Sequence, residues 1–134
     1  MLALVRAIYT ALEAAGMAGL GVTGIFEDKA KSGQEFPYII ISEQSAIDGY
    51  SHDRRSHTDY VYSIKCVDNS LSAIRCREIS EAIDAALTLQ PLTVTGHTAF
   101  FVRRTSQFAY TEERDGQFYR HRGGQYAMML SPNI

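Results

Sequence analysis

Residues 59–87, DYVYSIKCVDNSLSAIRCREISEAIDAAL, hold a strand and a helix in direct succession. Residues 59–67 alternate between two faces, a pattern typical of a half-buried strand, and one face carries Tyr60, Tyr62, Ile64 and Cys66. The capping residues Asp68-Asn69-Ser70 then introduce a helix, and Gln90-Pro91 ends it. The apolar stripe of this helix consists of Ala73, Cys76, Ile79, Ala82, Ile83, Ala86 and Leu87.

The segment on the N-terminal side predicts a second strand. In Phe36-Pro37-Tyr38-Ile39-Ile40-Ile41-Ser42, the proline stands near the start of the strand, where its missing N–H is tolerated. Three consecutive isoleucines make both faces apolar, so we expect a helix on one face and a neighbouring subunit on the other. Residues 45–58 are polar and contain Asp48-Gly49, and we expect them to form a long mobile loop.

The N-terminal region predicts another helix and a short strand. From Leu2 to about Ala15, apolar residues recur at helical spacing, and Gly16 is well placed to end this helix in a left-handed cap. A short strand is expected around Val22 to Phe26. The predicted fold is therefore α+β, with two helices packed on one antiparallel sheet.

The C-terminal region predicts only strands. We expect them at Leu92 to Val94, from Thr98 to about Thr111, and from Gln117 to Leu130. A turn at Asp115-Gly116 joins the last two into a long C-terminal hairpin. Because these two arms are long for a small domain, we expect either a bulge near Gly123-Gly124 or a hairpin that projects from the body.

Composition and charge bound the class of protein. A chain of 134 residues, 46% hydrophobic and 21% charged, fits one domain over residues 1–134. A net charge of -2 argues against an independent nucleic-acid binder. The two cysteines form no C-x-x-C motif, which favours a reducing cytoplasm. Arg6 interrupts the N-terminal apolar stretch, unlike a signal peptide, and no apolar run approaches the roughly 20 residues of a membrane span.

Several patterns resemble ligand-binding motifs but lack the neighbouring elements or the spacing that such motifs require. Residues 19–24 match G-x-G-x-x-G, but they follow a predicted helix and enter a strand, the reverse of a nucleotide-binding turn. His52 and His57, with Asp53 and Asp59, lack the spacing of a known metal-ligand motif. Cys66 and Cys76 alternate with apolar residues and are interpreted as core residues. We therefore assign no catalytic residue, no cofactor and no metal ligand.

Basic charge is concentrated in the C-terminal hairpin. Residues 97–134 hold five basic and three acidic side chains, and the bases are Arg103, Arg104, Arg114, Arg120 and Arg122. Aromatic residues alternate with them, and arginine with aromatics is typical of protein interfaces and of single-strand nucleic-acid surfaces. The acidic whole chain favours a protein partner. A solvated sheet face with scattered ion pairs is the alternative interpretation.

Three segments carry a resemblance to a known family. They are the N-terminal amphipathic helix near Ile8 to Ala15 with its glycine-rich exit, the strand Phe36-Pro37-Tyr38-Ile39-Ile40-Ile41, and the run from the aromatic strand at Tyr60 through the helix at Glu78 to Leu87 and Pro91-Leu92. In order and spacing, they resemble the tail-completion family of long-tailed bacteriophages and prophages. This family comprises tail terminator and tail-to-head joining proteins. The similarity covers nearly the whole chain.

The resemblance implies a structural protein without catalysis, assembled as a ring, expected to be a hexamer, at the head-proximal end of the tail tube. Its partners would be further copies of itself, the tail tube protein and the head connector protein. Genomic DNA would pass through the lumen without sequence-specific binding, and no membrane is involved. The protein would reside in the host bacterial cytoplasm during assembly and then in the tail and neck of the virion.

Candidate interface residues follow from this implied role. We expect bonds between copies from the arginines to carboxylates, with two glutamates as reciprocal partners. These residues are Arg103, Arg104, Arg120, Arg122, Glu112 and Glu113. The polar loop, including Asp53, Arg54 and Arg55, is expected to become ordered on docking. Two alternatives remain: another phage head-tail assembly factor, such as a head-closure protein or tail chaperone, or a small cytosolic ligand-binding domain or enzyme that uses the histidine loop.

Overall fold

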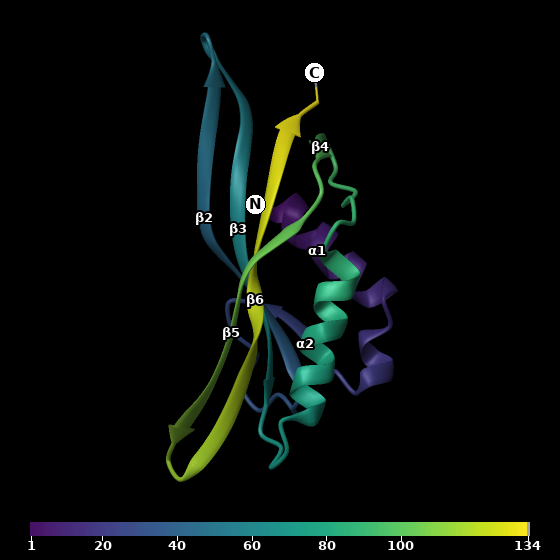
Figure 1. Ribbon diagram of the computed structural model, residues 1–134, viewed down its shortest axis with the longest axis vertical. Coiled ribbons are helices and arrows are strands. Elements are labelled where there is room, and N and C mark those ends of the chain that lie inside the picture. The colour runs from purple at the N-terminus through teal and green to yellow at the C-terminus, as the bar shows by residue number, and fades with distance from the viewer. Residues whose placement is uncertain (134) are drawn as a thin grey trace.

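Two helices pack on one face of a six-stranded sheet in the computed structural model, which describes residues 1–133 (Figure 1). The elements are α1 (Leu2–Ala14), the 3-10 helix η1 (Met17–Leu20), β1 (Ile25–Glu27), β2 (Tyr38–Ser51), β3 (Arg54–Asp68), α2 (Ile74–Leu87), β4 (His97–Ala99), β5 (Arg103–Arg114) and β6 (Gln117–Pro132). The strand order is β1-β2-β3-β6-β4, and β5 also pairs with β6. The β1–β2 pair is parallel and the other pairs are antiparallel, so the predicted α+β class is confirmed.

The core lies between the sheet and the helices because the predicted apolar faces meet there. The fully buried side chains include Tyr62 and Ile64 from β3, Leu4, Ile8 and Leu12 from α1, and Ile79, Ile83 and Leu87 from α2. Burying one such aliphatic side chain stabilises the fold by about 1.5–3 kcal/mol relative to leaving it in water. Cys66 and Cys76 are free thiols in this core, as predicted. Contact with Cys76 and burial raise the pKa of the Cys66 thiol.

The segment predicted as a mobile loop is a hairpin. Residues 45–58 form most of the projecting β2–β3 arm, and Ser51 pairs with Arg54 across a two-residue turn of His52 and Asp53. His52 takes the left-handed conformation that such a turn requires, with φ 58°. The loop prediction is wrong because no helix covers this arm, so both of its faces carry polar residues and the usual alternation is lost.

The start of α2 also differs from the prediction. The helix begins at Ile74 rather than directly after Asp68-Asn69-Ser70. Asp68 is fully buried and accepts hydrogen bonds from the Asn69 backbone N–H at 2.8 Å and from Arg75 at 2.6 Å. Its carboxylate therefore ties the end of β3 to the first turn of α2 instead of capping the helix.

The first part of the C-terminal region is more broken than predicted, whereas the last strand, β6, extends to Pro132. Residues 92–94 form no strand, and the expected strand from Thr98 to about Thr111 is divided into β4 and β5. Val102, in the break, is fully buried in the core and bridges to Thr88. Burial of this one side chain requires the chain to leave the edge of the sheet between β4 and β5.

A bulge was expected near Gly123-Gly124, which lie in β6. The bulge is found instead in the neighbouring strand β5, between Arg104 and Ser106. The two glycines are instead positions where a neighbouring strand approaches the backbone of β6 closely. A Cβ atom at Gly123 would lie 2.2 Å from the carbonyl oxygen of Ile64, so glycine is needed where β6 approaches β3. The predicted projection of the C-terminal hairpin is confirmed (Figure 1).

The strand β2 is covered on both faces, and its second cover comes from the chain itself. Ile39 and Ile41 face the core, whereas Ile40 lies on the opposite face and is only 6% exposed. Ile40 lines a hollow together with Phe36 from the β1–β2 connection and Val67 from β3. Side chains of the chain itself therefore already cover most of Ile40, and the expectation that a neighbouring subunit lies on this face stays a prediction.

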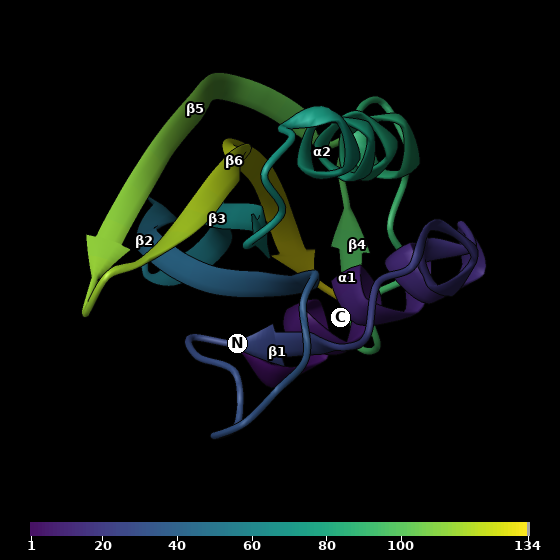
Figure 2. The same ribbon diagram turned by 90° about the horizontal axis from the view of Figure 1, so that it is seen from below.

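The β2–β3 and β5–β6 hairpins extend beyond the helices in opposite directions (Figure 1). Seen from below, the helices lie together on one side and the ends of β5 and β6 curl away on the other (Figure 2). Within residues 1–133, neither helix combines the length and apolar character needed to cross a membrane.

Candidate functional site

The six predicted interface residues lie on two different faces of the β5–β6 hairpin. Arg104 pairs across the strands with Tyr126, whose side chain is buried against the helices. By strand alternation, the side chains on this helix side are those of Arg104, Glu113, Arg120 and Arg122. Arg103 and Glu112 lie on the opposite face. The structure therefore does not bring the six residues together as one surface.

Arg104 anchors β5 to α2. Its guanidinium lies 3.4 Å from the carboxylate of Asp84, and both side chains are only about a quarter exposed. The hydroxyl of Tyr126 donates to the same carboxylate at 3.4 Å, and burial raises the pKa of that phenol. An arginine that was a candidate for contacts between copies thus already has a carboxylate partner inside the chain.

Arg120 anchors β6 to the β3–α2 connection. Its Nε donates to the carbonyl oxygen of Ser70 at 3.0 Å, and its terminal nitrogen donates to that of Leu71 at 2.9 Å. The guanidinium also lies 5.5 Å from the ring centre of Phe118. Arg120 thus connects the projecting β5–β6 hairpin to the irregular β3–α2 connection and holds that connection in place.

Glu112 belongs to a small polar cluster on the opposite face. It lies 3.1 Å from Nε2 of His121, whose ring stacks on Tyr110 with centroids 4.5 Å apart. The ammonium of Lys65 donates to the Tyr110 hydroxyl at 3.0 Å. Burial, assisted by the Lys65 charge, lowers the pKa of His121 despite its carboxylate partner. The imidazole is therefore neutral at pH 7, with Nε2–H donating to Glu112.

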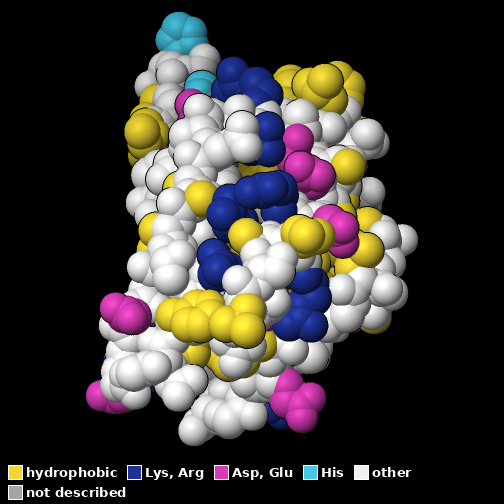
Figure 3. All heavy atoms as spheres, turned by 60° about the horizontal axis from the view of Figure 1, so that its bottom comes forward, with side chains coloured by type: hydrophobic (Ala, Val, Ile, Leu, Met, Phe, Trp, Pro, Cys, Tyr) yellow, Lys and Arg dark blue, Asp and Glu magenta, His cyan; other side chains and the backbone are white. Residues whose placement is uncertain are grey.

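Arg122 remains available on the helix side. It lines a cleft between α2 and β5 together with Arg77, Glu81 and Gln107. Figure 3 shows Lys and Arg side chains gathered in a stripe across the face that carries α2 and β5, with Asp and Glu side chains on both sides of it. A surface of this kind suits a protein partner with mixed charges.

The tip of the β2–β3 hairpin holds the three predicted docking residues. Asp53 is in the turn, and Arg54 and Arg55 begin β3. Arg55 lies 3.6 Å from Asp48, with both side chains well exposed. In residues 1–133, no three His, Cys, Asp or Glu side chains gather to hold a metal, so the loop histidines form no metal cluster there.

Exposed apolar side chains on the same hairpin were missed by sequence reasoning. Ile47 is 64% exposed and Tyr50 is 68% exposed. A second group lies beyond the C-terminal end of α2, where Leu89, Phe100 and Phe101 are all exposed. Large apolar side chains in solvent mark interaction surfaces when they occur together. Phe100 and Phe101 were among the aromatic residues that the sequence grouped with the C-terminal arginines, whereas Ile47, Tyr50 and Leu89 were not singled out.

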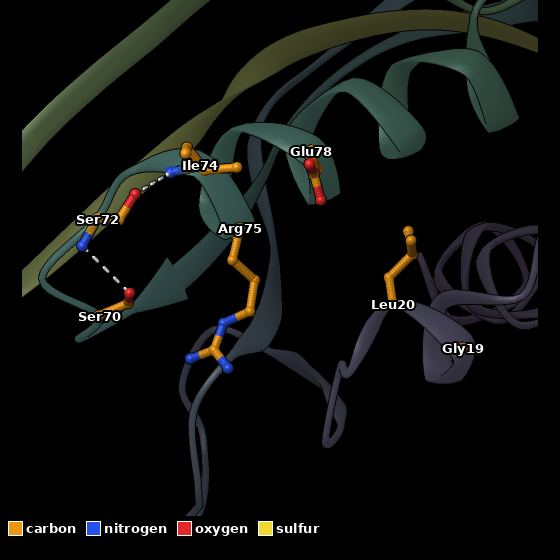
Figure 4. Close-up of a pocket in the computed structure, with 7 residues that line it drawn as sticks. All are labelled: Gly19, Leu20, Ser70, Ser72, Ile74, Arg75 and Glu78. Atoms are coloured by element: carbon orange, nitrogen blue, oxygen red, sulfur yellow. Dashed lines mark hydrogen bonds between the residues drawn. The ribbon is translucent and has the colours of Figure 1, made fainter.

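A further hollow lies between η1 and the start of α2. Its lining includes Leu20 from η1 and Ile74, Arg75 and Glu78 from α2 (Figure 4). Arg75 is held by the buried Asp68, and this hydrogen bond raises the pKa of the guanidinium. The G-x-G-x-x-G residues form the turns around η1, where Gly21 has φ 89°, and they precede β1 instead of opening a helix.

Comparisons with known proteins agree with this geometry. The family model described as tail completion protein gp17 matches residues 6–123. A chain of the "virion of native gene transfer agent (GTA) particle" is similar in fold, with a TM-score of 0.77, 14% identity and 92% of both chains covered. The "structure of bacteriophage SPP1 gp17 protein" has a TM-score of 0.52 and 18% identity, covering 98% of this chain and 89% of that one. No curated protein matches the sequence.

Proposed function

Because the chain belongs to the tail completion protein gp17 family, we propose that it is a ring subunit that caps the tail tube of a phage or phage-like particle and joins it to the head. The family supports a structural role in the tail, and such a role requires no catalytic group. The presence of a similar fold in a gene transfer agent virion supports a location in the assembled particle.

The observation that carries the proposal is the pair of hairpins that extend in opposite directions from one body (Figure 1). Beyond its short pairing with β1 at residues 39–41, β2 has an outer edge without a partner strand in the described chain. The outer edge of β5 is likewise unpaired along Arg103–Arg114. Open edges of long strands are readily used for contacts with other chains.

Ring closure needs two unlike surfaces that fit each other on neighbouring copies. Contacts of this heterologous kind give a closed ring when the rotation between copies divides a full turn. We propose a hexamer, with Arg103, Arg122 and Glu113 at contacts between copies and Arg104, Arg120 and Glu112 fixing the hairpin that presents them. Their contacts inside the chain support this division of roles.

The β2–β3 hairpin is proposed to dock on the next ring, formed by the tail tube protein or the head connector protein. Its exposed Ile47 and Tyr50 supply apolar area, and Asp53, Arg54 and Arg55 surround it with charge. DNA would pass through the lumen without specific binding, because a net negative subunit attracts few phosphates. Assembly would take place in the host cytoplasm before the ring joins the virion.

The test measures the mass of the purified protein by light scattering over a concentration series, and then its effect on polymerising tail tube protein. We expect a discrete ring, or a smaller species that caps tubes at a defined length in electron micrographs. Ile47→Asp should abolish capping, while Thr10→Asp, which adds the same charge on exposed α1, should not. A protein that forms no ring and leaves tube length unchanged would contradict the terminator role and favour a head-side assembly factor.

A further inference from the structure

All three lysines of the chain surround one hollow on the sheet face opposite the helices. Lys29 and Lys31 come from the β1–β2 connection and Lys65 comes from β3, and Arg114 completes the basic lining from the end of β5. Figure 2 shows this connection and the end of the β5–β6 hairpin on the same side of the molecule. Segments far apart in sequence thus assemble one basic site.

The hollow has a built aromatic wall. Phe36 stacks on Tyr38 with ring centroids 5.1 Å apart and on Tyr119 with centroids 5.5 Å apart. Arg114 lies over the ring of Tyr119 at 5.3 Å. These contacts fix the β1–β2 connection against the hairpin before any ligand arrives. A ligand that enters a preorganised site avoids the entropy cost of ordering it.

The cations of the hollow lack anionic partners. Among residues 1–133, Lys29, Lys31 and Arg114 make no ion pair within 4.0 Å. The carboxylates in the lining belong to Asp28 and Glu112, and Glu112 is already bonded to His121. The four cations exceed these two carboxylates, so the hollow carries a local positive charge in a chain whose net charge is negative.

A buried polar atom at the same site also lacks a partner. His121 lines the hollow and is only 8% exposed, and its Nδ1 makes no hydrogen bond within the described chain. Buried polar atoms of this kind are rare, because leaving one unpaired costs free energy. Because Nε2–H of the neutral ring donates to Glu112, Nδ1 is an acceptor, so its partner in a bound peptide would be an N–H group and not a carboxylate.

We propose that this hollow binds the carboxylates of an acidic segment on a partner protein. Lysines and an arginine without anionic partners among residues 1–133 provide charge-assisted hydrogen bonds, and the aromatic wall accepts the apolar parts of a peptide. The carboxylates of Asp28 and Glu112 interrupt the basic lining, so a continuous run of phosphates fits less well than spaced carboxylates. The site does not depend on ring formation, and its test can succeed whether or not the ring exists.

Reductive methylation with ¹³C-formaldehyde gives a direct readout, because it labels only the three lysines and the terminal amine and preserves the lysine charge. The probe is the peptide acetyl-Asp-Glu-Phe-Asp-Glu-Phe-amide, and its matched control replaces each acid by the corresponding amide. We expect saturable shifts of the three methyl-lysine signals with the acidic peptide and none with the amide peptide. Equal shifts with both peptides, or no saturable shift with the acidic one, would overturn the proposal.

Charge variants locate the site. Lys29→Gln with Lys31→Gln should weaken binding of the acidic peptide, followed by fluorescence anisotropy, by about tenfold or more. Arg54→Gln with Arg55→Gln removes the same charge from the distant β2–β3 tip and should leave the affinity unchanged. An equal loss of affinity in both variants would indicate nonspecific electrostatic attraction and contradict a specific site in the hollow. Tighter binding of inorganic phosphate or oligothymidine than of the peptide would also reject a carboxylate site.

Discussion

The two projecting hairpins are built alike but are held differently. Both have a two-residue turn, closed by Ser51 and Arg54 in β2–β3 and by Arg114 and Gln117 in β5–β6. The β5–β6 hairpin is tied back to the body by Arg104 on α2, Arg120 on the β3–α2 connection and the stacking of Tyr119 on Phe36. The outer part of β2–β3 relies mainly on contacts within itself, such as Thr58 donating to Asp48 at 2.7 Å.

This difference teaches how one sheet can provide a fixed and an adaptable surface. Anchors to several elements give β5–β6 a defined position, whereas β2–β3 can change its angle at the cost of few contacts outside the arm. Segments with few buried contacts open at low free energy and serve for docking.

The largest effect on stability is expected where a glycine lies close to the backbone of a neighbouring strand. Gly123→Ala should lower the free energy of unfolding by about 3 kcal/mol, because its methyl group would meet the backbone of β3. Gly49→Ala in the other hairpin meets only the His57 ring, which can rotate away, so it should cost no more than about 1 kcal/mol. Urea unfolding followed by circular dichroism measures both, and equal losses would contradict the contrast.

The next effect concerns the arginine anchors. Arg120→Ala should cost about 1.5–2 kcal/mol, because a charged donor to two backbone carbonyl groups is lost. Arg55→Ala in β2–β3 breaks only an exposed ion pair and should cost about 0.5 kcal/mol or less. The same urea titration compares the two variants. A larger loss for Arg55→Ala would show that β2–β3 is the better anchored arm.

The two turns should respond unequally to substitution. Gly116 has φ 75°, so Gly116→Ala forces a side chain into the left-handed region and should cost about 1 kcal/mol. His52 already has φ 58°, so His52→Gly relieves backbone strain while raising the entropy of the unfolded chain, and stability should stay within about 0.5 kcal/mol. Thermal unfolding gives the comparison. Destabilisation of His52→Gly as large as that of Gly116→Ala would argue against this account.

The smallest effect is a pH dependence confined to β5–β6. Since the pKa of folded His121 lies below the ordinary value of 6.5, the unfolded chain binds more protons between those two values. Stability should therefore rise with pH through this window and level off above about 6.5. His121→Gln should flatten this part of the curve of unfolding free energy against pH. His52→Gln, at the exposed tip of the other hairpin, is the matched control, and an identical flattening there would contradict the assignment.

Much of the fold could be predicted from local patterns. Tyr62, Ile64 and Cys66 alternate with the polar residues Ser63 and Lys65, and the apolar residues of α2 recur at helical spacing, so strand and helix were both identified. The turn at Asp115-Gly116 was also correct. The loop prediction for residues 45–58 failed because a strand pair exposed on both faces lacks the usual alternation of apolar and polar residues. The prediction that Asp68 caps α2 was wrong because its carboxylate is buried against Arg75, and this contact cannot be predicted from local helix propensity.

The candidate interface was less predictable. Sequence reasoning grouped Arg103, Arg104, Glu112, Glu113, Arg120 and Arg122, and strand register divides them between two faces. It overlooked Lys29, Lys31 and Lys65 as a set because they occur in a loop and in a strand. Their shared position depends on how the β1–β2 connection folds over β2.

The sequence by itself determined the two helices, the central strands of the sheet and which of their faces are apolar, because these properties depend on residues within a few turns or pleats of one another. Only the tertiary structure decided what covers Ile40, which arginines are bonded inside the chain, and that all three lysines share one hollow. Those outcomes depend on strand register and sheet curvature, which are fixed by contacts between residues far apart in the chain.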